Sequence, residues 1–388
     1  MKTVIEFIGE EPMENLITSL NFKMERAVMI GRSSVIDELG DRTRRILEKY
    51  CGIESTDFYK VDEENLDAVK ARVREIIEAE IADGNEIYFD MTGGENVILT
   101  AFGMVADDYD TPMHVFDVEE DHIVDLGGSS DRSIFHDVEE RKVEITPDLM
   151  VEMHGGRINY GLHKDTKAID DEEFAKDVAK LWSVEEKFKE EWNLLSIFLR
   201  EHMMPEKSLH ASVETEKARS ALANMGKAMN TLAELDRLLD ALSEQGLITD
   251  LHRDGGYYNF SYKSQGVKEC LRDGGSTLEL YTYARERKEA DYCMVGVHLD
   301  WDGVIHETSG IDVYNEIDVF SIKGNVPKFI SCKTGKMSPS NTLHALYELN
   351  TVATRFGGKY ARKVLVTSRP VADVYKTRAS EMGIEVEE

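Results

Sequence analysis

The alternation of short apolar runs with amphipathic helical stretches over residues 1–150 constrains the fold more than any other feature. Runs rich in β-branched and aromatic residues predict strands at 2–9, 27–33, 85–94, 112–118 and 122–128. Residues 66–84 predict a helix. Its inward face is expected to carry Ile76, Ile77, Ala79 and Ile81. This order is typical of a largely parallel sheet covered by helices on both sides, in which ligands bind beyond the carboxyl ends of the strands.

Changes of pattern divide the remainder of the chain. Residues 151–185 are polar and are expected to form a connector with one helix. Residues 186–265 are mainly helical and end in two predicted strands around an Asp-Gly-Gly turn, the outline of a winged helix. Residues 266–388 follow the order helix, strands, helix, strand. An α/β fold with a winged-helix-like middle segment is therefore predicted.

The charge of the 388-residue chain, −29 in total, is unevenly distributed. Residues 266–388 contain 16 Lys and Arg against 18 Asp and Glu, whereas the first 265 residues contain 30 against 57. Bulk electrostatics therefore repel nucleic acid from the N-terminal two-thirds, and the nearly neutral remainder is the better place for a polyanion. Solubility or adaptation to salt is the simpler explanation of the acidic excess.

The sequence offers no sign of a membrane, zinc or disulfide protein. No uninterrupted apolar run approaches the ~20 residues of a membrane helix. The acidic N-terminal stretch does not resemble a signal peptide, and none of the four cysteines forms a CxxC pair. We therefore expect a cytoplasmic protein.

The stretch NEIDVFSIKGNVPKFISCKTGK, residues 315–336, combines two predicted strands with charged side chains. Because side chains alternate along a strand, Glu316 and Asp318 share one face of the first strand, and Ser331 and Lys333 share one face of the second, so that the hairpin points the carboxylates and the lysine the same way. A further acid, Glu279, lies in the apolar stretch TLELYTY of the preceding predicted helix. Carboxylates suit magnesium, which lowers the pKa of an attacking water, and a lysine can stabilise the developing charge.

At these residues the sequence resembles the PD-(D/E)xK nucleases, and more closely the CRISPR ancillary nucleases that have an N-terminal CARF domain. The resemblance rests on GGSTLELYTYARER, NEIDVF and CKTGK, and on DMTGG nearer the N-terminus, and it covers nearly the whole chain. It implies that residues 1–150 are a CARF-like ligand-sensing domain and that residues 266–388 are a restriction-endonuclease-like α/β nuclease domain. It also matches Glu279 to the helix acid, Asp318 to the metal-binding aspartate and Lys333 to the catalytic lysine.

The chain departs from the family pattern at Ser331, where the family has Asp or Glu. Three alternatives stay open: Glu316 supplies the missing charge, Glu348 on the following helix replaces it, or the nuclease is weakened or inactive. The predicted metal ligands are Glu279, Asp318 and Glu316, for magnesium or manganese. Taken singly, such charged residues are more often solvated, turn-forming or edge-protecting. Their order and spacing together favour a nuclease-type site.

The stretch YFDMTGGENVILTAF predicts a strand, a Gly-Gly turn and a helix whose free backbone N–H groups suit an anion. It lacks the lysine of a Walker loop and the GxGxxG spacing, which disfavours ATP hydrolysis and NAD binding. TGG alone is also compatible with an ordinary turn. The loops GEEPMEN and GRSS should lie at the same edge. The candidate ligand-binding residues are Gly9, Glu10, Glu11, Pro12, Met13, Asn15, Arg32, Ser33, Ser34, Thr92, Gly93, Gly94 and Asn96.

In the CARF family this edge binds a cyclic oligoadenylate at a two-fold dimer interface. The resemblance therefore implies a homodimer, activated by a cyclic oligoadenylate such as cyclic tetra-adenylate, that cuts single-stranded DNA or RNA in type III CRISPR defence. The alternative is a cyclic-oligoadenylate-responsive nucleic-acid-binding regulator with a degenerate nuclease site. Ser331 supports that alternative, and the acidity of the middle segment opposes it.

Overall fold

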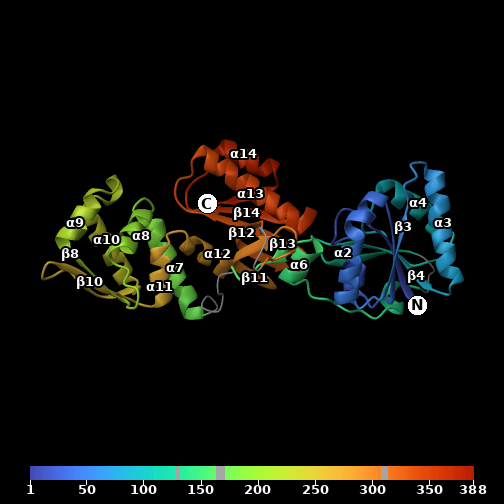
Figure 1. Cartoon of the computed structure of the whole chain (residues 1–388), viewed down its shortest axis with the longest axis horizontal. Coiled ribbons are helices and arrows are strands. Elements are labelled where there is room, and N and C mark those ends of the chain that lie inside the picture. Colours follow the sequence, from blue (N-terminus) through green and yellow to red (C-terminus); the bar gives the residue numbers. More distant parts are fainter. Residues whose placement is uncertain (110, 128–131, 163–170, 307–312) are drawn as a thin grey trace.

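The computed structural model of the chain describes residues 1–109, 111–127, 132–162, 171–306 and 313–388. Figure 1 shows an elongated molecule with three parts side by side. The N-terminal sheet domain lies at one end, the C-terminal sheet domain in the middle and the winged-helix-like segment at the other end. None of the described helices is long and apolar enough to cross a membrane.

The N-terminal domain contains a mainly parallel sheet with strand order β3-β2-β1-β4-β5-β6, in which only β6 runs antiparallel to its neighbour. Its strands are β1 (Lys2–Phe7), β2 (Arg26–Gly31), β3 (Ser55–Lys60), β4 (Glu86–Asp90), β5 (Met113–Asp117) and β6 (His122–Gly127). Its helices are α1 (Ile17–Asn21), α2 (Ser33–Cys51), α3 (Leu66–Ala82), α4 (Asn96–Ala106) and α5 (Ile134–Asp137). The strand order reverses between β1 and β4, which is where ligands of such sheets bind.

Side chains alternate across this sheet and build a separate core on each face. Val4 packs in the core that contains α1 and α2, whereas its neighbour Ile5 packs in the core that contains α3 and α4. The predicted inward face of α3 was partly wrong. Ile76 and Ile77 are buried, but Ala79 and Ile81 are exposed, because helical periodicity instead turns Val69, Val73 and Glu80 inward.

The middle segment contains α7 (Glu172–Lys187), α8 (Trp192–His202), α9 (Thr215–Ala223), the short 3₁₀ helix η2 (Lys227–Met229), α10 (Leu232–Glu244) and α11 (Gln265–Arg272). Its sheet has the order β8-β10-β9, formed by β8 (His210–Glu214), β9 (Ile248–His252) and β10 (Tyr257–Tyr262). Gly255 and Gly256 both have positive φ in the turn between β9 and β10, as the Asp-Gly-Gly signal predicts. Apolar residues of the helices and the sheet form one core.

The C-terminal domain has the strand order β15-β14-β13-β12-β11-β7. Its strands are β11 (Tyr292–Asp300), β12 (Tyr314–Lys323), β13 (Val326–Lys333), β14 (Arg362–Thr367) and β15 (Ile384–Glu387), with β7 (Arg157–Ile158) added from the connector. Its helices are α12 (Ser276–Glu286), α13 (Pro339–Gly357), η3 (Gly358–Tyr360) and α14 (Asp373–Glu381). The strands β11, β12 and β13 form an antiparallel meander, and β13, β14 and β15 run parallel.

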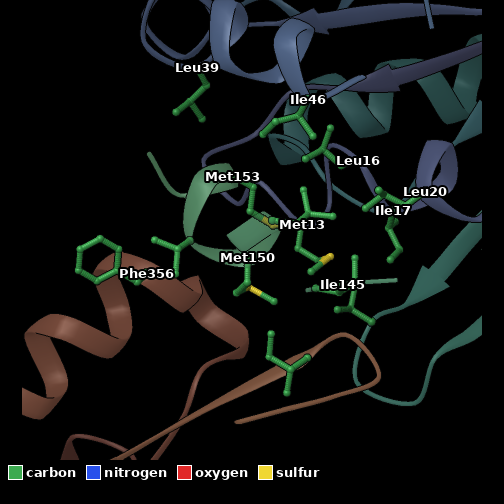
Figure 2. Packing of buried hydrophobic residues seen from close by; sticks show 14 of the residues in the cluster. Met13, Leu16, Ile17, Leu20, Leu39, Ile46, Ile145, Met150, Met153 and Phe356 are labelled. Atoms are coloured by element: carbon green, nitrogen blue, oxygen red, sulfur yellow. The ribbon is translucent and has the colours of Figure 1, made fainter. Parts of the chain in front are cut away.

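A single apolar cluster joins the two sheet domains. Figure 2 shows Leu39 and Ile46 of α2 above Met150 and Met153 of α6 (Pro147–Met153), with Phe356 of α13 on the other side. All of these side chains are buried or nearly so. The helix α6 thus packs against α2 of one domain and α13 of the other.

Candidate functional site

The candidate nuclease site lies where β12 and β13 cease to pair. Their ladder ends at Val319 and Ile330, and beyond this point the Asp318 carboxylate replaces a backbone partner. Its Oδ2 atom accepts hydrogen bonds from the Cys332 backbone N–H at 2.6 Å and from the Ser331 hydroxyl at 3.2 Å. The Lys333 Nζ atom lies 3.6 Å from the same oxygen. The structure therefore brings Asp318, Ser331 and Lys333 together, as their spacing predicts.

Burial strengthens this arrangement. The side chains of Asp318 and Lys333 are 15% and 35% exposed, so their interaction is only partly screened by solvent. The end of β13 is held from its other side, because Lys333 pairs with Thr367 of β14 and its carbonyl oxygen accepts a hydrogen bond from the Ser368 N–H. Lys333 is thus on a fixed strand, while its amine reaches the partly solvated edge.

Glu279 approaches the same region from α12. One turn further along α12, Thr282 lies with its hydroxyl 3.6 Å from the Cys332 Sγ atom. Burial, followed by the charge of Asp318 and more weakly that of Glu279, raises the pKa of the Cys332 thiol. The charges of Asp318, on the strand, and of Glu279, on the helix, therefore both act on this thiol.

The two candidate replacements for the missing carboxylate have other neighbours. Glu316 is exposed and lies 3.8 Å from the Nε2 atom of His298 on the adjacent strand. Glu348 accepts a hydrogen bond from Asn315 at 3.1 Å and lies 3.7 Å from His344. Within the described ranges, no group of three or more His, Cys, Asp or Glu side chains is arranged to hold a metal ion. The metal ligand set thus stays a prediction.

The second candidate site is the edge of the N-terminal sheet where the loops after β1 and β4 meet. The Asn15 amide bonds both the N–H and the carbonyl of Gly9, each at 2.8 Å, and so closes the first loop. A side chain at Gly9 would lie 3.3 Å from the Gly94 nitrogen, and one at Gly94 would lie 2.4 Å from Phe7. The loops can approach this closely only because both positions are glycine.

Several side chains predicted to bind a ligand have partners within the protein. Arg32 forms an ion pair with Glu95 and donates to the carbonyl oxygens of Val61 and Glu63. Ser33 bonds the Asp62 carboxylate through its N–H and its hydroxyl. In the TGG loop, the Thr92 N–H donates to Asp90, and its hydroxyl accepts from the Phe116 N–H.

Other predicted residues differ mainly in burial. Met13 is 2% exposed and packs in the core shown in Figure 2, so only its backbone remains for a ligand. Pro12 is half-buried, whereas Glu10, Ser34 and Asn96 are exposed. The helix α4 begins after Glu95 without a side-chain cap, which leaves its first backbone N–H groups for water or an anion.

The loop after β1 is also bonded to the C-terminal domain. Glu11 accepts from the Lys359 N–H at 2.8 Å, and its carboxylate occupies the space beside Gly358, where a Cβ atom would lie 2.2 Å away. Its Oε1 atom lies 3.6 Å from His154 Nε2. Burial alone would raise the pKa of Glu11, but the interaction with His154 and the hydrogen bond from the Lys359 N–H outweigh it and lower the pKa.

Glu14 makes the corresponding contact one turn along. It forms an ion pair with Lys359 and accepts a hydrogen bond from the Tyr360 hydroxyl at 2.7 Å. A Cβ atom added to Gly93 would lie 2.7 Å from the Glu14 Cβ atom, so Glu14 contacts the TGG loop as well. Sequence reasoning missed Glu14, Lys359 and Tyr360. In the sequence these residues belong to an ordinary acidic loop and to a Gly-Gly helix end. Neither pattern indicates which residues it contacts.

A buried polar cluster lies beneath the same sheet edge. The Thr18 hydroxyl donates to Asp90 at 2.7 Å and lies 2.8 Å from His114 Nε2. Burial, and then the charge of Asp90, raises the pKa of the fully buried Glu6 carboxyl well above its ordinary value. Burial also lowers the pKa of His114, so the cluster favours a protonated Glu6 and a neutral imidazole.

Comparison with known proteins places the C-terminal residues in a family. Residues 268–387 match the family described as "Card1-like, endonuclease domain". The C-terminal domain is a Card1-like endonuclease domain. The predicted resemblance to CRISPR ancillary nucleases is thereby confirmed for this domain, whereas the roles of Glu279, Asp318 and Lys333 stay predictions. No curated protein sequence matches the chain.

Two solved structures share the fold over the whole length. Protein VC1899 from Vibrio cholerae is 20% identical, with a TM-score of 0.71, and the match covers 100% of this chain and 93% of that one. Can2 from Sulfobacillus thermosulfidooxidans, solved in complex with cyclic tetra-adenylate, is 16% identical, with a TM-score of 0.64 and coverage of 100% and 95%. At these identities the likeness confirms the predicted α/β fold.

Proposed function

We propose that this protein is a metal-dependent endonuclease of type III CRISPR defence that a cyclic oligoadenylate activates. One observation carries the nuclease part of the proposal. In a Card1-like endonuclease domain, the Ser331 hydroxyl and the Lys333 amine both lie at one carboxylate oxygen of Asp318. The activator is proposed because Can2, solved with cyclic tetra-adenylate, shares the fold over the full length of this chain.

The side chains present fit magnesium or manganese. Asp318 and Glu279 offer carboxylate oxygens from two elements that both approach Cys332, and magnesium is commonly bound by one or two carboxylates with water and substrate phosphate. When bound, the metal would supply charge neutralisation and a more acidic water. Asp318 would hold the metal, Lys333 would position the attacking water or stabilise the developing phosphate charge, and Ser331 would orient the Asp318 carboxylate.

Activation would act through the loop after β1. This loop borders the predicted ligand edge through Gly9, and it bonds the C-terminal domain through Glu11 and Glu14. A ligand changes activity only if it binds one arrangement of the protein more tightly than another. We propose that the cyclic ligand binds at the two-fold axis of a homodimer and displaces this loop, and that the displacement repositions the nuclease domains for single-stranded substrate.

A second function is supported by Ser331. If a hydroxyl in place of a carboxylate leaves the site unable to hold metal, the protein would be a ligand-responsive nucleic-acid-binding regulator. The winged-helix-like segment would then be the reading element, although α10 is acidic, with the sequence LAELDRLLDALSE.

The deciding experiment is a cleavage assay on labelled single-stranded DNA and RNA with manganese or magnesium, with and without cyclic tetra-adenylate. We expect ligand-dependent cutting that Lys333→Ala reduces by about 10²-fold or more. Lys336→Ala is the matched control, because this exposed lysine lies three residues away outside the Asp318 contact. Ligand binding without cutting in the wild-type chain would reject the nuclease and favour the regulator.

A further inference from the structure

A cleft of about 660 Å³ lies between the two sheet domains, and basic side chains line it. One wall is α2, the other is the segment from α6 to β7, and the loop after β11 closes one end. The lining side chains that matter for charge are Arg42, Arg45, Lys49, Asp148, Glu152, Arg157 and Asp302. The cleft is separate from the contacts of Glu11 and Glu14 and from the Asp318 site.

The acidic side chains of the cleft are already engaged. Glu152 accepts hydrogen bonds from Lys49 and the Tyr50 hydroxyl, each at 2.7 Å. Asp148 accepts from the Tyr160 hydroxyl at 2.7 Å, and Asp302 accepts from the Val304 N–H at 2.8 Å. These hydrogen bonds leave the carboxylates charged, and Glu152 also interacts electrostatically with Arg45.

Among the described residues, the arginines of the cleft are not paired with a carboxylate. Within the described ranges, Arg42, Arg45 and Arg157 form no ion pair, although the chain has 75 acidic against 46 basic residues. Arg42 lies so close over Gly155 that a Cβ atom there would be 2.4 Å from its guanidinium. The nearby Arg355, whose charge acts on Arg42, donates to the carbonyl oxygens of His154 and Trp301.

Two of these guanidinium groups repel one another. Burial and then the charge of Arg355 lower the pKa of Arg42, whereas the charge of Glu38 opposes this shift. Burial also lowers the pKa of Arg355, and Glu38 is the acid whose charge opposes this shift. Half-buried like charges without an ion-pair partner are unfavourable in the free protein, and a bound anion would relieve them.

We propose that this cleft binds the phosphodiester backbone of the single-stranded substrate beside the nuclease site. Guanidinium groups on two facing walls suit phosphate oxygens, because their planar donors bind them in pairs. A cleft of about 660 Å³ also has room for more than a single ion.

The position of the cleft relative to the nuclease site supports this assignment. Arg157 pairs with Asp300 at the end of β11, and Asp300 pairs with Tyr314 at the start of β12, four residues before Asp318. Strand spacing places the two sites on the order of 15 Å apart at the same end of the sheet. A strand of a few nucleotides could therefore occupy both, and in this respect the inference rests on the proposed nuclease function.

The test measures binding, so that it does not depend on cleavage. In the Lys333→Ala background, the affinity for a short labelled single strand is measured by fluorescence anisotropy at several salt concentrations. The double variant Arg45→Ala with Arg157→Ala removes two exposed arginines of the cleft. Arg44→Ala is the matched control, since it is the neighbouring arginine of α2 and its partners are Asp41 and the ring of Phe58.

We expect the double variant to weaken binding about tenfold or more, and to reduce the slope of log affinity against log salt by about 1.4. Arg44→Ala should leave both unchanged. Equal effects of the double variant and the control would overturn the proposal, as would equally strong competition by inorganic phosphate or a mononucleotide. If binding depends on the arginines but the wild-type chain does not cut, the proposed cleft stands and the nuclease function is rejected. If the wild-type chain cuts and the double variant cuts equally well, the nuclease function stands and the proposed cleft is rejected.

Discussion

The end of β13 and the edge of the N-terminal sheet differ in what they leave available to a ligand. At the first, one carboxylate oxygen of Asp318 gathers three donors, and the partly exposed Lys333 amine faces the solvated edge. At the second, Arg32, Ser33 and Asn15 are bonded within the protein, and the glycine-rich backbone forms the surface. A site built from side chains depends on a few atoms, whereas a site built from backbone depends on the shape of its loops.

The largest expected effect follows from this difference. Asp318→Asn removes the charge that holds Lys333 and would hold metal, so cleavage should fall by about 10²–10³-fold. Ligand affinity should not change, because Asp318 is distant from the sheet edge. Cleavage rate and equilibrium binding of cyclic tetra-adenylate measured on the same preparation check both parts. Asp373→Asn, an exposed acid of α14, is the control, and an equal loss in both variants would contradict the assignment.

A smaller effect is expected where the two regions meet. Glu11→Gln weakens the acceptor for the Lys359 N–H and His154, so it should lower the free energy of unfolding by about 1–2 kcal/mol and reduce stimulation by the ligand. Basal cutting should change less than stimulated cutting. Glu54→Gln, an exposed acid of the same domain outside the predicted ligand edge, is the control. If stimulation survives Glu11→Gln intact, the loop after β1 does not couple the domains.

The pH dependence of this effect has a definite sign. The pKa of Glu11 is lower in the folded state than in the unfolded chain, so its contribution to stability is present above the unfolded value of about 4.3. It is lost as pH falls through the lower folded value. The difference in Tm between the wild type and Glu11→Gln should therefore be constant near neutral pH and shrink in acid.

What the sequence could predict follows the same division. Asp318, Ser331 and Lys333 were predictable because strand alternation fixes which side chains meet across a hairpin. The partners of Glu11 and Glu14 were not, because residues 358–360 lie more than three hundred positions away in the chain. The strand β3 was also missed, since its half-exposed sequence STDFYK lacks the apolar run of a buried strand. The proximity of Arg42 and Arg355 could not be predicted either, because it depends on how α2 packs against the C-terminal domain.

The smallest expected effect on cleavage comes from Glu6, a buried residue of the N-terminal domain that can be compared with Glu11. Its pKa is raised, opposite to that of Glu11, because burial and Asp90 disfavour its charge. The folded state therefore retains a proton that the unfolded chain releases, and this group costs stability as pH rises above the unfolded value of about 4.3. Glu6→Gln removes the titration and keeps the shape of the side chain. It should raise the free energy of unfolding at neutral pH.

That gain should disappear in acid, where wild-type Glu6 is protonated in both states. Thermal unfolding of both proteins across this pH range provides the measurement, with cleavage as the second readout. A gain that persists undiminished at low pH would mean that Glu6 is ionised in the fold and that the amide acts through packing. If ligand-dependent cutting is unchanged in Glu6→Gln, the buried cluster only supports the sheet edge. The loop contacts of Glu11 would then be the ones that transmit the signal.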